Sequence, residues 1–320
     1  MVIIRIVGGL GNQMQQYALS RKLISLGREV CLDISTYSDA DYRGTVRSLE
    51  IDRFPGVRYD TATEEQIAAI RGDGSLIGRI RNRILPACSG YVHEKGMYMP
   101  GIFKRDNVYL DGYWSAEKYY ADIMPELRDI YDFAEMLGRD PVDGSDTEMA
   151  GTGSVGDAHS GLREMARCIT GNGYSCSVHI RRGDYLTAEN SAFFGGIATD
   201  GYYEAAFSYV KERHPEVRFF IFSDDPGYVK EKYGDDPSCV VVDVNHGDDN
   251  MYDIYLMSLC TAHICANSSF SFWGARLDPK RESALCIRPT IHAASQVFDP
   301  EIMRDLWKNW VFIDPQGNLR

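Results

Sequence analysis

Short apolar runs alternate with longer amphipathic stretches along most of this chain. The first run, Val2–Val7, is followed by a glycine-rich turn, by a helical pattern over 11–26 that Gly27 ends, and by a second run at 29–33. A strand, a helix and a strand in this order predict a βαβ unit. Beyond it the pattern is less regular: it predicts a helix near 63–70, a strand over 108–114 and a helix from about Ala116.

The second half of the chain has a more regular spacing. It predicts strands at 175–180, 217–222, 239–244, 262–266 and 284–287, and helices at about 201–213, 226–233, 250–260 and 272–277. Strands that alternate with helices predict a parallel, doubly wound sheet.

One segment between the two halves is too polar to belong to a core. Residues 138–161 read GRDPVDGSDTEMAGTGSVGDAHSG, which is rich in Gly, Asp, Ser and Pro. This composition is typical of a linker. With 320 residues the chain exceeds the usual size of one domain. We therefore expect two domains, 1–160 and 161–320, with the linker at the end of the first.

Charge and cysteine content exclude several classes of protein. The formal net charge of −12 argues against binding along a nucleic acid backbone and against electrostatic adhesion to anionic lipid. The apolar run at the N-terminus is too short for a secretion signal or a membrane span, and no other stretch is long enough. The eight cysteines are scattered without a CxxC pair, which favours reduced, buried thiols. A cytoplasmic location is the expectation.

Three polar clusters follow three of the predicted strands. HIRRGDY at 179–185 ends the first strand of the second half, Ser223-Asp224-Asp225 follows VRFFIF, and Asn267-Ser268-Ser269 follows HICA. The carboxyl ends of parallel strands meet at one edge of the sheet, where ligands bind. Each cluster alone is weak evidence, since an arginine pair is often solvated and an Asp pair often caps a helix. Together they predict one binding site.

The three clusters suit a nucleoside diphosphate. The guanidinium groups of Arg181 and Arg182 match phosphate oxygens in pairs. The carboxylates of Asp224 and Asp225 can accept hydrogen bonds from a base, and this favours guanine, whose edge has adjacent donors. Serine hydroxyls and the amides of a helix start can hold further phosphate oxygens.

The glycine turn VGGLGNQ has other interpretations. Gly9 and Gly11, with Asp33 at the end of the next strand, imitate a dinucleotide-binding fingerprint. Met14, however, replaces the third glycine that such a fingerprint needs for close packing of the helix. A tight turn between strand and helix is one alternative. A loop that lets substrate approach the backbone, with Asn12 as its polar tip, is the other.

Two further stretches remain open. Asp39-Ala40-Asp41 has the DxD pattern with which metal-dependent sugar transferases hold a nucleotide diphosphate, but no strand precedes it, so it also fits a solvated loop. Because Arg181 and Arg182 can neutralise the diphosphate, no metal is required. The basic stretch GRIRNR at 78–83 is either a solvated face or a docking surface for an acceptor or a phospholipid.

Five motifs resemble those of glycosyltransferase family 11, the bacterial and animal α-1,2-fucosyltransferases. They are GGLGNQMQQYALSRKL at 8–23, LDGYW at 110–114, HIRRGDY at 179–185, FSDD at 222–225 and NSSFSFWGARL at 267–277. The HxRRxD pattern is also similar to that of α-1,6- and protein O-fucosyltransferases. The linker at 138–161 departs from the family, as does Met14-Gln15, where the family more often has Leu-Phe. Both departures leave the donor motifs intact.

The resemblance implies a GT-B-like α/β architecture, in which two Rossmann-like domains face a cleft and the N-terminal one is the acceptor side. It implies GDP-fucose as the donor, inversion at the anomeric carbon, no obligatory metal or other cofactor, and a glycan acceptor that ends in a β-galactoside. An acceptor linked to lipid would add contact with the inner face of a bacterial membrane. Carried over by position, Arg181 contacts the β-phosphate, His179 and Asp224 the nucleoside, and Ser268, Ser269 and Phe270 the diphosphate region.

The remaining roles concern the proton and the arginines. In the α-1,6 relatives a glutamate ten residues after the motif histidine accepts the proton, and the same offset gives Glu189 here. Asp184 is a second candidate, although it is expected to fix an arginine instead. The rival interpretations are a non-catalytic protein that binds a nucleotide or a glycan and a nicotinamide-dependent oxidoreductase. Turnover of GDP-fucose and stabilisation by GDP rather than NAD would separate them.

Overall fold

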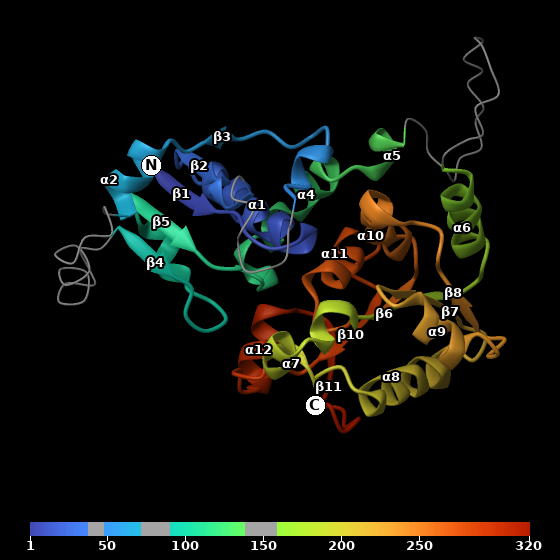
Figure 1. Ribbon diagram of the computed structural model, residues 1–320. Coiled ribbons are helices and arrows are strands. Elements are labelled where there is room, and N and C mark those ends of the chain that lie inside the picture. The colour runs from blue at the N-terminus through green and yellow to red at the C-terminus, as the bar shows by residue number, and fades with distance from the viewer. Residues whose placement is uncertain (38–47, 72–89, 138–158) are drawn as a thin grey trace, which may run out of the picture. The chain divides into compact units, whose positions relative to one another are not determined.

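The computed structural model describes residues 1–37, 48–71, 90–137 and 159–320. The chain divides into two compact units, Met1–Asp132 and Phe133–Arg320. Figure 1 shows the first unit in blue to green and the second in green to red. Each unit is an α/β structure built on a parallel sheet.

The first unit has a five-stranded sheet in the order β3-β2-β1-β5-β4. Every pairing in it is parallel, and Ile3 of β1 lies between Cys31 of β2 and Tyr109 of β5. Helix α1 packs against β1 and β2, and α2 covers a small core of Ile3, Cys31, Ala62 and Tyr109. The strands are β1 (Val2–Arg5), β2 (Val30–Asp33), β3 (Asp60–Thr61), β4 (Tyr91–His93) and β5 (Val108–Asp111); the helices are α1 (Leu10–Ser25), α2 (Glu64–Arg71) and α4 (Met124–Ile130).

The second unit has a six-stranded parallel sheet in the order β11-β10-β9-β6-β7-β8. All six residues of the central strand β6 are buried, as expected for a strand that is covered on both faces of the sheet. The strands are β6 (Ser175–Ile180), β7 (Arg218–Ser223), β8 (Cys239–Val241), β9 (Ala262–Ile264), β10 (Leu285–Pro289) and β11 (Trp310–Ile313).

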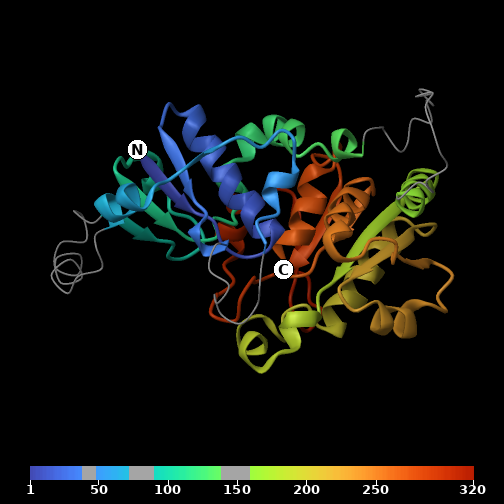
Figure 2. The ribbon, with the colours of Figure 1, turned by 45° about the horizontal axis from the view of Figure 1, so that its top comes forward.

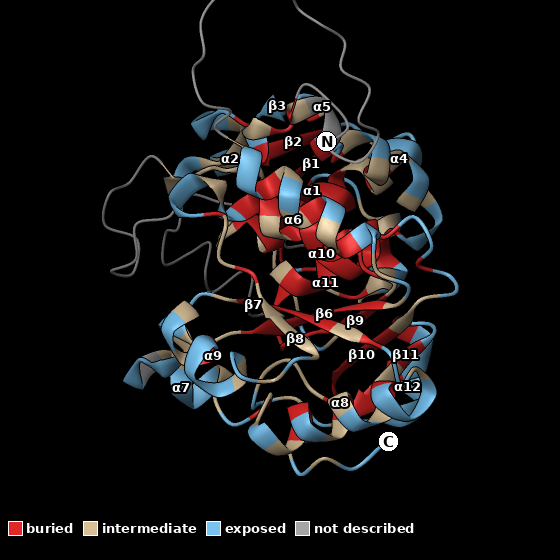
Figure 3. Cartoon of the chain, turned by 90° about the vertical axis from the view of Figure 1, so that its right-hand side faces the viewer, coloured by how far each residue is buried: buried red, intermediate tan, exposed pale blue. Residues whose placement is uncertain are grey.

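Helices cover both faces of this second sheet. Figure 3 shows α6, α10 and α11 on one side of the buried strands and α8, α9 and α12 on the other. The turned view in Figure 2 shows the same two helix layers around the sheet. The helices are α5 (Phe133–Met136), α6 (Ser160–Thr170), α7 (Ala188–Phe194), α8 (Asp200–Arg213), α9 (Pro226–Tyr233), α10 (Tyr252–Ser258), α11 (Ser269–Leu277) and α12 (Pro300–Leu306).

The structure confirms the predicted α/β class with two Rossmann-like parts, the components of a GT-B-like fold. The strand at 175–180 and the helix at 226–233 agree with the prediction at both ends. The helix predicted from about Ala116 is wrong at its start, since 3-10 turns precede α4 there. Several elements of the structure are not predicted by the sequence pattern, most of them short or at an edge of a sheet: β3, β4, β11, α6, α7 and α12.

The division of the chain also differs from the expected one. The sequence predicts a change of domain at 160/161, whereas the compact units divide at 132/133. The reason is aromatic packing, because the Phe133 ring lies 6.1 Å from that of Tyr252 and 5.9 Å from that of Tyr255 in α10. Most of the predicted linker, 138–158, lies outside the described residues, as do the DxD pattern, the basic stretch at 78–83 and Cys88.

Candidate functional site

The order of strands in the second sheet places a crevice between β6 and β9. Strands β6, β7 and β8 run toward one edge, and the chain then returns to place β9 on the other side of β6. Ligands of doubly wound sheets bind beyond the carboxyl ends of the strands at such a reversal. Arg181 directly follows β6, and Asn267 lies three residues after β9. The topology therefore brings two of the three polar clusters to the position where a ligand is expected.

Arg181 is held between two carboxylates. Its Nη2 lies 2.6 Å from Oδ1 of Asp184, and its Nη1 lies 3.1 Å from Oδ2 of Asp224. The side chain of Arg181 is 23% exposed. Because a guanidinium group has five N–H donors, these two contacts fix its plane and leave donors for a ligand. Asp184 thus fixes an arginine, and Asp224 does the same from the end of β7.

Arg182 is fixed in a similar way by the next aspartate. Its Nε donates to Oδ2 of Asp225 over 3.0 Å, and its guanidinium carbon lies 3.6 Å from the centre of the Tyr228 ring. The backbone N–H of Arg182 donates to Oδ1 of Asp224 over 2.8 Å. Asp225 also caps α9, since its Oδ1 accepts from the backbone N–H of Tyr228 over 3.1 Å. The capping interpretation of this Asp pair is therefore correct for Asp225, but capping is only part of its role.

The third cluster is tied to the first by the side chain of Tyr185 and by ring packing. The Tyr185 hydroxyl donates to the carbonyl oxygen of Asn267 over 3.1 Å. The ring of Phe270 lies 5.6 Å from that of His179. Ser268 and Ser269 are buried at the start of α11. The prediction that the three polar clusters share one edge of the sheet is confirmed by these contacts.

His179 is buried at the end of β6 and is only 4% exposed. Burial, and to a lesser extent the charge of Arg181, lowers its pKa to about 3. The imidazole is therefore neutral at physiological pH and cannot supply a positive charge. Its Nδ1 makes no hydrogen bond with the residues that the structure describes. The described residues therefore leave the hydrogen-bonding capacity of this ring nitrogen unused.

A pocket of about 300 Å³ opens beside these clusters. Both arginines and Asn267 line it, together with aromatic rings and a glycine pair from the loop after α7. Its lining consists of Ile180, Arg181, Arg182, Tyr185, Leu186, Ser191, Phe194, Gly195, Gly196, Ala198, Thr199, Asp200, Tyr203, Tyr228, Tyr233 and Asn267. Aromatic walls with a few convergent polar groups are typical of a small-molecule site.

The charges of the site nearly cancel. Two guanidinium groups and the carboxylates of Asp184, Asp224 and Asp225 sum to −1. The arginines therefore offer directed N–H donors more than a net positive charge. For catalysis, direction is the more useful property, because donors fixed in advance need no reorganisation when charge develops on a leaving group.

The other predicted donor residues lie in different surroundings. Glu189 lies in α7, but its side chain is outside the described residues. Gly9, Gly11 and Asn12 lie in the first unit, where Gly9 precedes α1. Gly8, with φ of +85°, is the residue of this turn that needs glycine's conformational freedom. Its carbonyl oxygen accepts from the side-chain amide of Gln13 over 3.0 Å, so the turn is fixed from within the helix.

Dinucleotide binding at this turn does not agree with the surroundings of Asp33. That residue is 3% exposed, and its Oδ2 accepts from the Tyr109 hydroxyl over 2.5 Å. Its Oδ1 accepts from the backbone N–H of Ser35 over 3.0 Å. A carboxylate occupied in this way is not available to a ribose. Met14, at the place of the third glycine, is fully buried.

Two carboxylates with raised pKa values were not found by the sequence analysis. Glu94 follows β4, and burial raises its pKa to about 7. Asp253, in α10, accepts from the side-chain amide of Asn245 over 2.7 Å, and burial raises its pKa to about 7 as well. Neither residue belongs to a recognisable motif. Glu94 follows a three-residue strand that the pattern does not predict, and no signal in the sequence identified Asp253.

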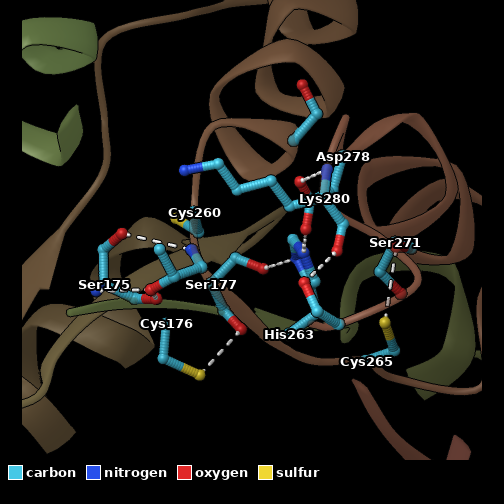
Figure 4. Close-up of polar contacts among 12 residues, drawn as sticks. Ser175, Cys176, Ser177, Cys260, His263, Cys265, Ser271, Asp278 and Lys280 are labelled. Atoms are coloured by element: carbon cyan, nitrogen blue, oxygen red, sulfur yellow. Dashed lines mark hydrogen bonds and ion pairs between the residues drawn. The ribbon is translucent and has the colours of Figure 1, made fainter. Parts of the chain in front are cut away.

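A second buried cluster has the residue types of a hydrolase triad without access to substrate. The Ser177 hydroxyl lies 2.9 Å from Nδ1 of His263, and Nε2 of His263 lies 3.2 Å from Oδ2 of Asp278 (Figure 4). All three residues are at most 2% exposed. The network joins β6 and β9 to the end of α11 and is structural, because a nucleophile must reach its substrate. It also stabilises the buried carboxylate.

Several observations concern metals, disulfides and membranes. Within 1–37, 48–71, 90–137 and 159–320, no three His, Cys, Asp or Glu side chains are grouped so that they could hold a metal ion. The seven cysteines in this part of the chain are free thiols. None of the helices that the structure describes is long and apolar enough to cross a membrane.

Comparisons with known proteins agree with the site. The family model described as glycosyl transferase family 11 matches residues 157–314. The chain is 30% identical to an alpha-1,2-colitosyltransferase of Escherichia coli, over 90% of this chain and 91% of the relative. It is 25% identical to the galactoside 2-alpha-L-fucosyltransferase Sec1 of Mus musculus, over 87% of this chain and 64% of the relative.

Among solved structures, the chain resembles the NodZ alpha-1,6-fucosyltransferase co-crystallised with GDP. The identity is 14%, the TM-score is 0.44, and the match covers 100% of this chain and 97% of that one. The match with the colitosyltransferase extends over nearly the full length of both chains, and the family model covers the polar clusters of the second unit. This chain therefore belongs to glycosyltransferase family 11, and it is a glycosyltransferase of the fucosyl- and colitosyltransferase type.

Proposed function

We propose that this enzyme transfers L-fucose from GDP-fucose to a hydroxyl of an acceptor glycan, with inversion at the anomeric carbon. The acceptor hydroxyl that we favour is O2 of a terminal β-galactoside. The observation that carries the proposal is the arginine pair after β6, held by three aspartates beside a pocket of about 300 Å³. Family membership supports the sugar class, and the galactoside 2-alpha-L-fucosyltransferase of Mus musculus supports the galactoside.

The arginines would act on the leaving group. As the bond between C1 of the sugar and the β-phosphate oxygen breaks, negative charge grows on GDP. The remaining N–H donors of Arg181 strengthen their hydrogen bonds to that oxygen, and so they stabilise the transition state more than the bound donor. Asp184 and Asp224 keep the guanidinium plane fixed during this change.

Other groups of the same edge would hold the rest of the donor. Ser268 and Ser269 lie at the start of α11, where backbone N–H groups favour phosphate oxygens. Neutral His179 would bind the nucleoside through a ring nitrogen. The carboxylate of Asp224 already contacts Arg181 and accepts from the backbone N–H of Arg182. Its remaining lone pairs would accept hydrogen bonds from the nucleoside. No metal is needed in this scheme, because the guanidinium and amide donors meet the diphosphate directly.

A second donor deserves a direct test because of the colitosyltransferase relative. Colitose lacks the 3-hydroxyl that fucose carries and is otherwise closely similar. A site with a polar group directed at that hydroxyl prefers fucose strongly, because the group is left unpaired by colitose. A site with an apolar contact there accepts both sugars.

Turnover is the decisive experiment. The full chain is incubated with GDP-fucose or GDP-colitose and a panel of β-galactosides, and the product linkage is determined by NMR. We expect transfer to O2 with a β-configured donor giving an α-linked product. A protein that binds GDP without turning over either donor with any acceptor would be a binding protein, and stabilisation by NAD rather than GDP would favour the oxidoreductase.

A variant of Asp224 tests the nucleotide site. Removing the carboxylate of Asp224 leaves the backbone N–H of Arg182 without its acceptor and frees one side of Arg181. Asp224→Ala should weaken GDP binding by on the order of 1–3 kcal/mol. Calorimetry that finds an unchanged affinity for GDP would remove Asp224 from the donor site.

A further inference from the structure

Three loops at the carboxyl edge of the second sheet meet at one side chain, that of Asn267. This residue follows β9 and lines the pocket, yet it is only 2% exposed. Its Nδ2 donates to the carbonyl oxygen of Phe194 over 3.2 Å and to that of His292 over 3.1 Å. Phe194 is the last residue of α7, and His292 lies three residues after β10. Both N–H groups of the amide are thus used within the protein, where they join two loops to a third.

These bonds attach α7 to the edge of the sheet. Strands β9 and β10 are parallel neighbours, so the loops after them begin side by side. A backbone bond lies close to the bonds of Asn267, since the N–H of Ala294 donates to the carbonyl oxygen of Phe193 over 2.8 Å. The end of α7 is therefore held at two consecutive residues. Of the groups that hold it, the amide of Asn267 is the side chain.

Asn267 also holds both members of an aromatic stack in the wall of the pocket. The rings of Tyr185 and Phe194 lie 5.0 Å apart at an interplanar angle of 18°, and both residues line the pocket. The backbone carbonyl oxygen of Asn267 accepts from the Tyr185 hydroxyl over 3.1 Å, while its Nδ2 donates to the backbone of Phe194. Stacked rings restrict each other's orientation. The position of the Tyr185 ring therefore depends on Asn267 through two routes.

The stack and α7 both support Arg181. The guanidinium carbon of Arg181 lies over the Tyr185 ring, 5.6 Å from its centre, within the distance at which a cation is attracted to an aromatic face. Helix α7 acts through Asp184, because Nδ2 of Asn190 donates to the carbonyl oxygen of Asp184 over 3.1 Å. The carboxylate of Asp184 in turn contacts the guanidinium group. A displacement of α7 would therefore reach Arg181 through a ring and through a carboxylate.

We propose that Asn267 is a positioning residue, which acts on transfer through Arg181 and not by contact with the donor. Its amide fixes the end of α7, its carbonyl group fixes Tyr185, and together they keep the guanidinium group directed at the leaving oxygen. Donors fixed in advance stabilise developing charge without reorganisation, and a displacement of about 1 Å can cost on the order of 10² in rate. This inference rests on the proposed function, in which Arg181 stabilises the leaving group.

Two substitutions of Asn267 remove its N–H donors. Asn267→Ala removes the whole amide, and Asn267→Asp keeps the shape of the side chain but directs an oxygen at two carbonyl oxygens. For both variants we expect kcat to fall by roughly 10–10², with the affinity for GDP within about fivefold of the parent. Asn172 provides the matched control, because its Nδ2 donates to the carbonyl oxygen of Cys168 before the opposite end of β6. Asn172→Ala and Asn172→Asp should have the kinetics of the parent.

A double-mutant cycle separates positioning from a donor contact or a general structural role. In an Arg181→Lys background the guanidinium group is absent, so Asn267→Ala should lower kcat by less than about threefold further. An equal loss in both backgrounds, or a kcat of Asn267→Ala within about threefold of the parent, would overturn the proposal. Should Asn267→Ala not fold, Tyr185→Phe removes only the hydroxyl that Asn267 holds. Its loss in kcat, about threefold to tenfold, should likewise disappear in the Arg181→Lys background, and a loss that persists there overturns the proposal.

The failure of the proposed function can be recognised separately. A parent chain that transfers neither fucose nor colitose disproves the proposed function, while the surroundings of Arg181 remain measurable without any donor. Nitrogen-15 NMR of the arginine Nε groups, with Arg181→Lys for assignment, gives the signal of Arg181. Asn267→Ala should shift or broaden that signal, and Asn172→Asp should leave it unchanged. A signal that is the same in Asn267→Ala and in the parent would overturn the inference without reference to turnover.

Discussion

The two units share a reversal of strand order in their sheets, but different residues lie at the edge where it occurs. In each, the sheet reverses its order next to its first strand, and the loops after two neighbouring strands meet at one edge. In the second unit that edge holds Arg181 and Arg182, fixed by side-chain carboxylates. In the first unit it holds Glu94, fixed by backbone N–H groups. The fold thus determines where a ligand can bind, and the residues after the strands determine which ligand binds.

The chemistry of the second edge suits the proposed leaving group. A leaving diphosphate needs several directed donors, and side chains with multiple N–H groups supply them. Substitutions at the edge of the second unit can therefore be expected to affect the donor.

The largest expected effect is on the donor side. Arg181→Ala should be folded and nearly inactive, with a loss in kcat of roughly 10³ or more. Arg181→Lys retains the charge but loses the paired N–H donors of the guanidinium group. Its affinity for GDP should therefore stay within about tenfold of the parent, whereas kcat should fall by a far larger factor. Steady-state kinetics and calorimetry with GDP measure the two quantities. Either variant working at close to the parent rate would mean that the arginine does not hold the leaving group.

Acid should destabilise the second unit selectively. Burial lowers the pKa of His179 and His292 to about 3 and also lowers that of His263. Below pH 6.5 the unfolded state therefore binds two protons, on His179 and His292, that the folded state does not bind, and the lowered pKa of His263 adds to this difference. Asp253, whose pKa is raised to about 7, offsets one of them. With about one excess proton in the unfolded state from these groups, and a further contribution from His263, stability should fall by about 1 kcal/mol or more per pH unit as pH decreases from 6 to 4.

The stability of the first unit should change in the opposite direction as pH falls. The pKa of Glu94 is raised to about 7, so between pH 7 and 4.5 the folded state binds the extra proton and gains stability as pH falls. Hydrogen exchange at pH 7 and pH 5 can follow each unit separately. Equal losses of protection in both units would show that these buried groups do not control the acid response.

Two glycine substitutions provide an intermediate test of the comparison. A Cβ at Gly112 would lie 2.9 Å from Oε2 of Glu94, and a Cβ at Gly183 would meet Oδ2 of Asp224. Gly183→Ala should weaken GDP binding, whereas Gly112→Ala should leave the affinity for GDP intact. Each should cost about 1–3 kcal/mol of stability.

Gly101→Ala is the matched control for these substitutions. A Cβ there meets nothing within 4 Å, so stability and kinetics should stay within about 0.5 kcal/mol of the parent. If Gly112→Ala weakened GDP binding and Gly183→Ala did not, the donor site would not lie at the edge of the second unit.

The smallest expected effect is that of chelation. Activity should persist in EDTA, because guanidinium and amide donors can stabilise the diphosphate without a cation. Rates measured before and after chelation, and again after addition of Mn²⁺, test this. A loss that Mn²⁺ restores and that Asp39→Ala reproduces would assign a metal to the DxD pattern.

The sequence by itself determined the α/β class, most elements of the second half and the family. Strands that are buried on both faces are nearly continuous apolar runs, and polar residues directly after such runs indicate the functional edge without further information. The arginine pair, the Asp pair after β7 and Asn267 could all be found in this way. The apolar runs of β3 and β4 are too short to give a clear pattern, so Glu94 after β4 could not be found.

Only the tertiary structure decided how these residues act. It showed that Arg181 and Arg182 are nearly neutralised by three aspartates, which are separated from them by up to 43 positions in the chain. It showed that His179 is neutral, and that the sequence-distant Ser177, His263 and Asp278 form an inaccessible network. Charge pairing, burial and pKa depend on distances between segments remote in sequence, and a pattern along the chain contains no such distances.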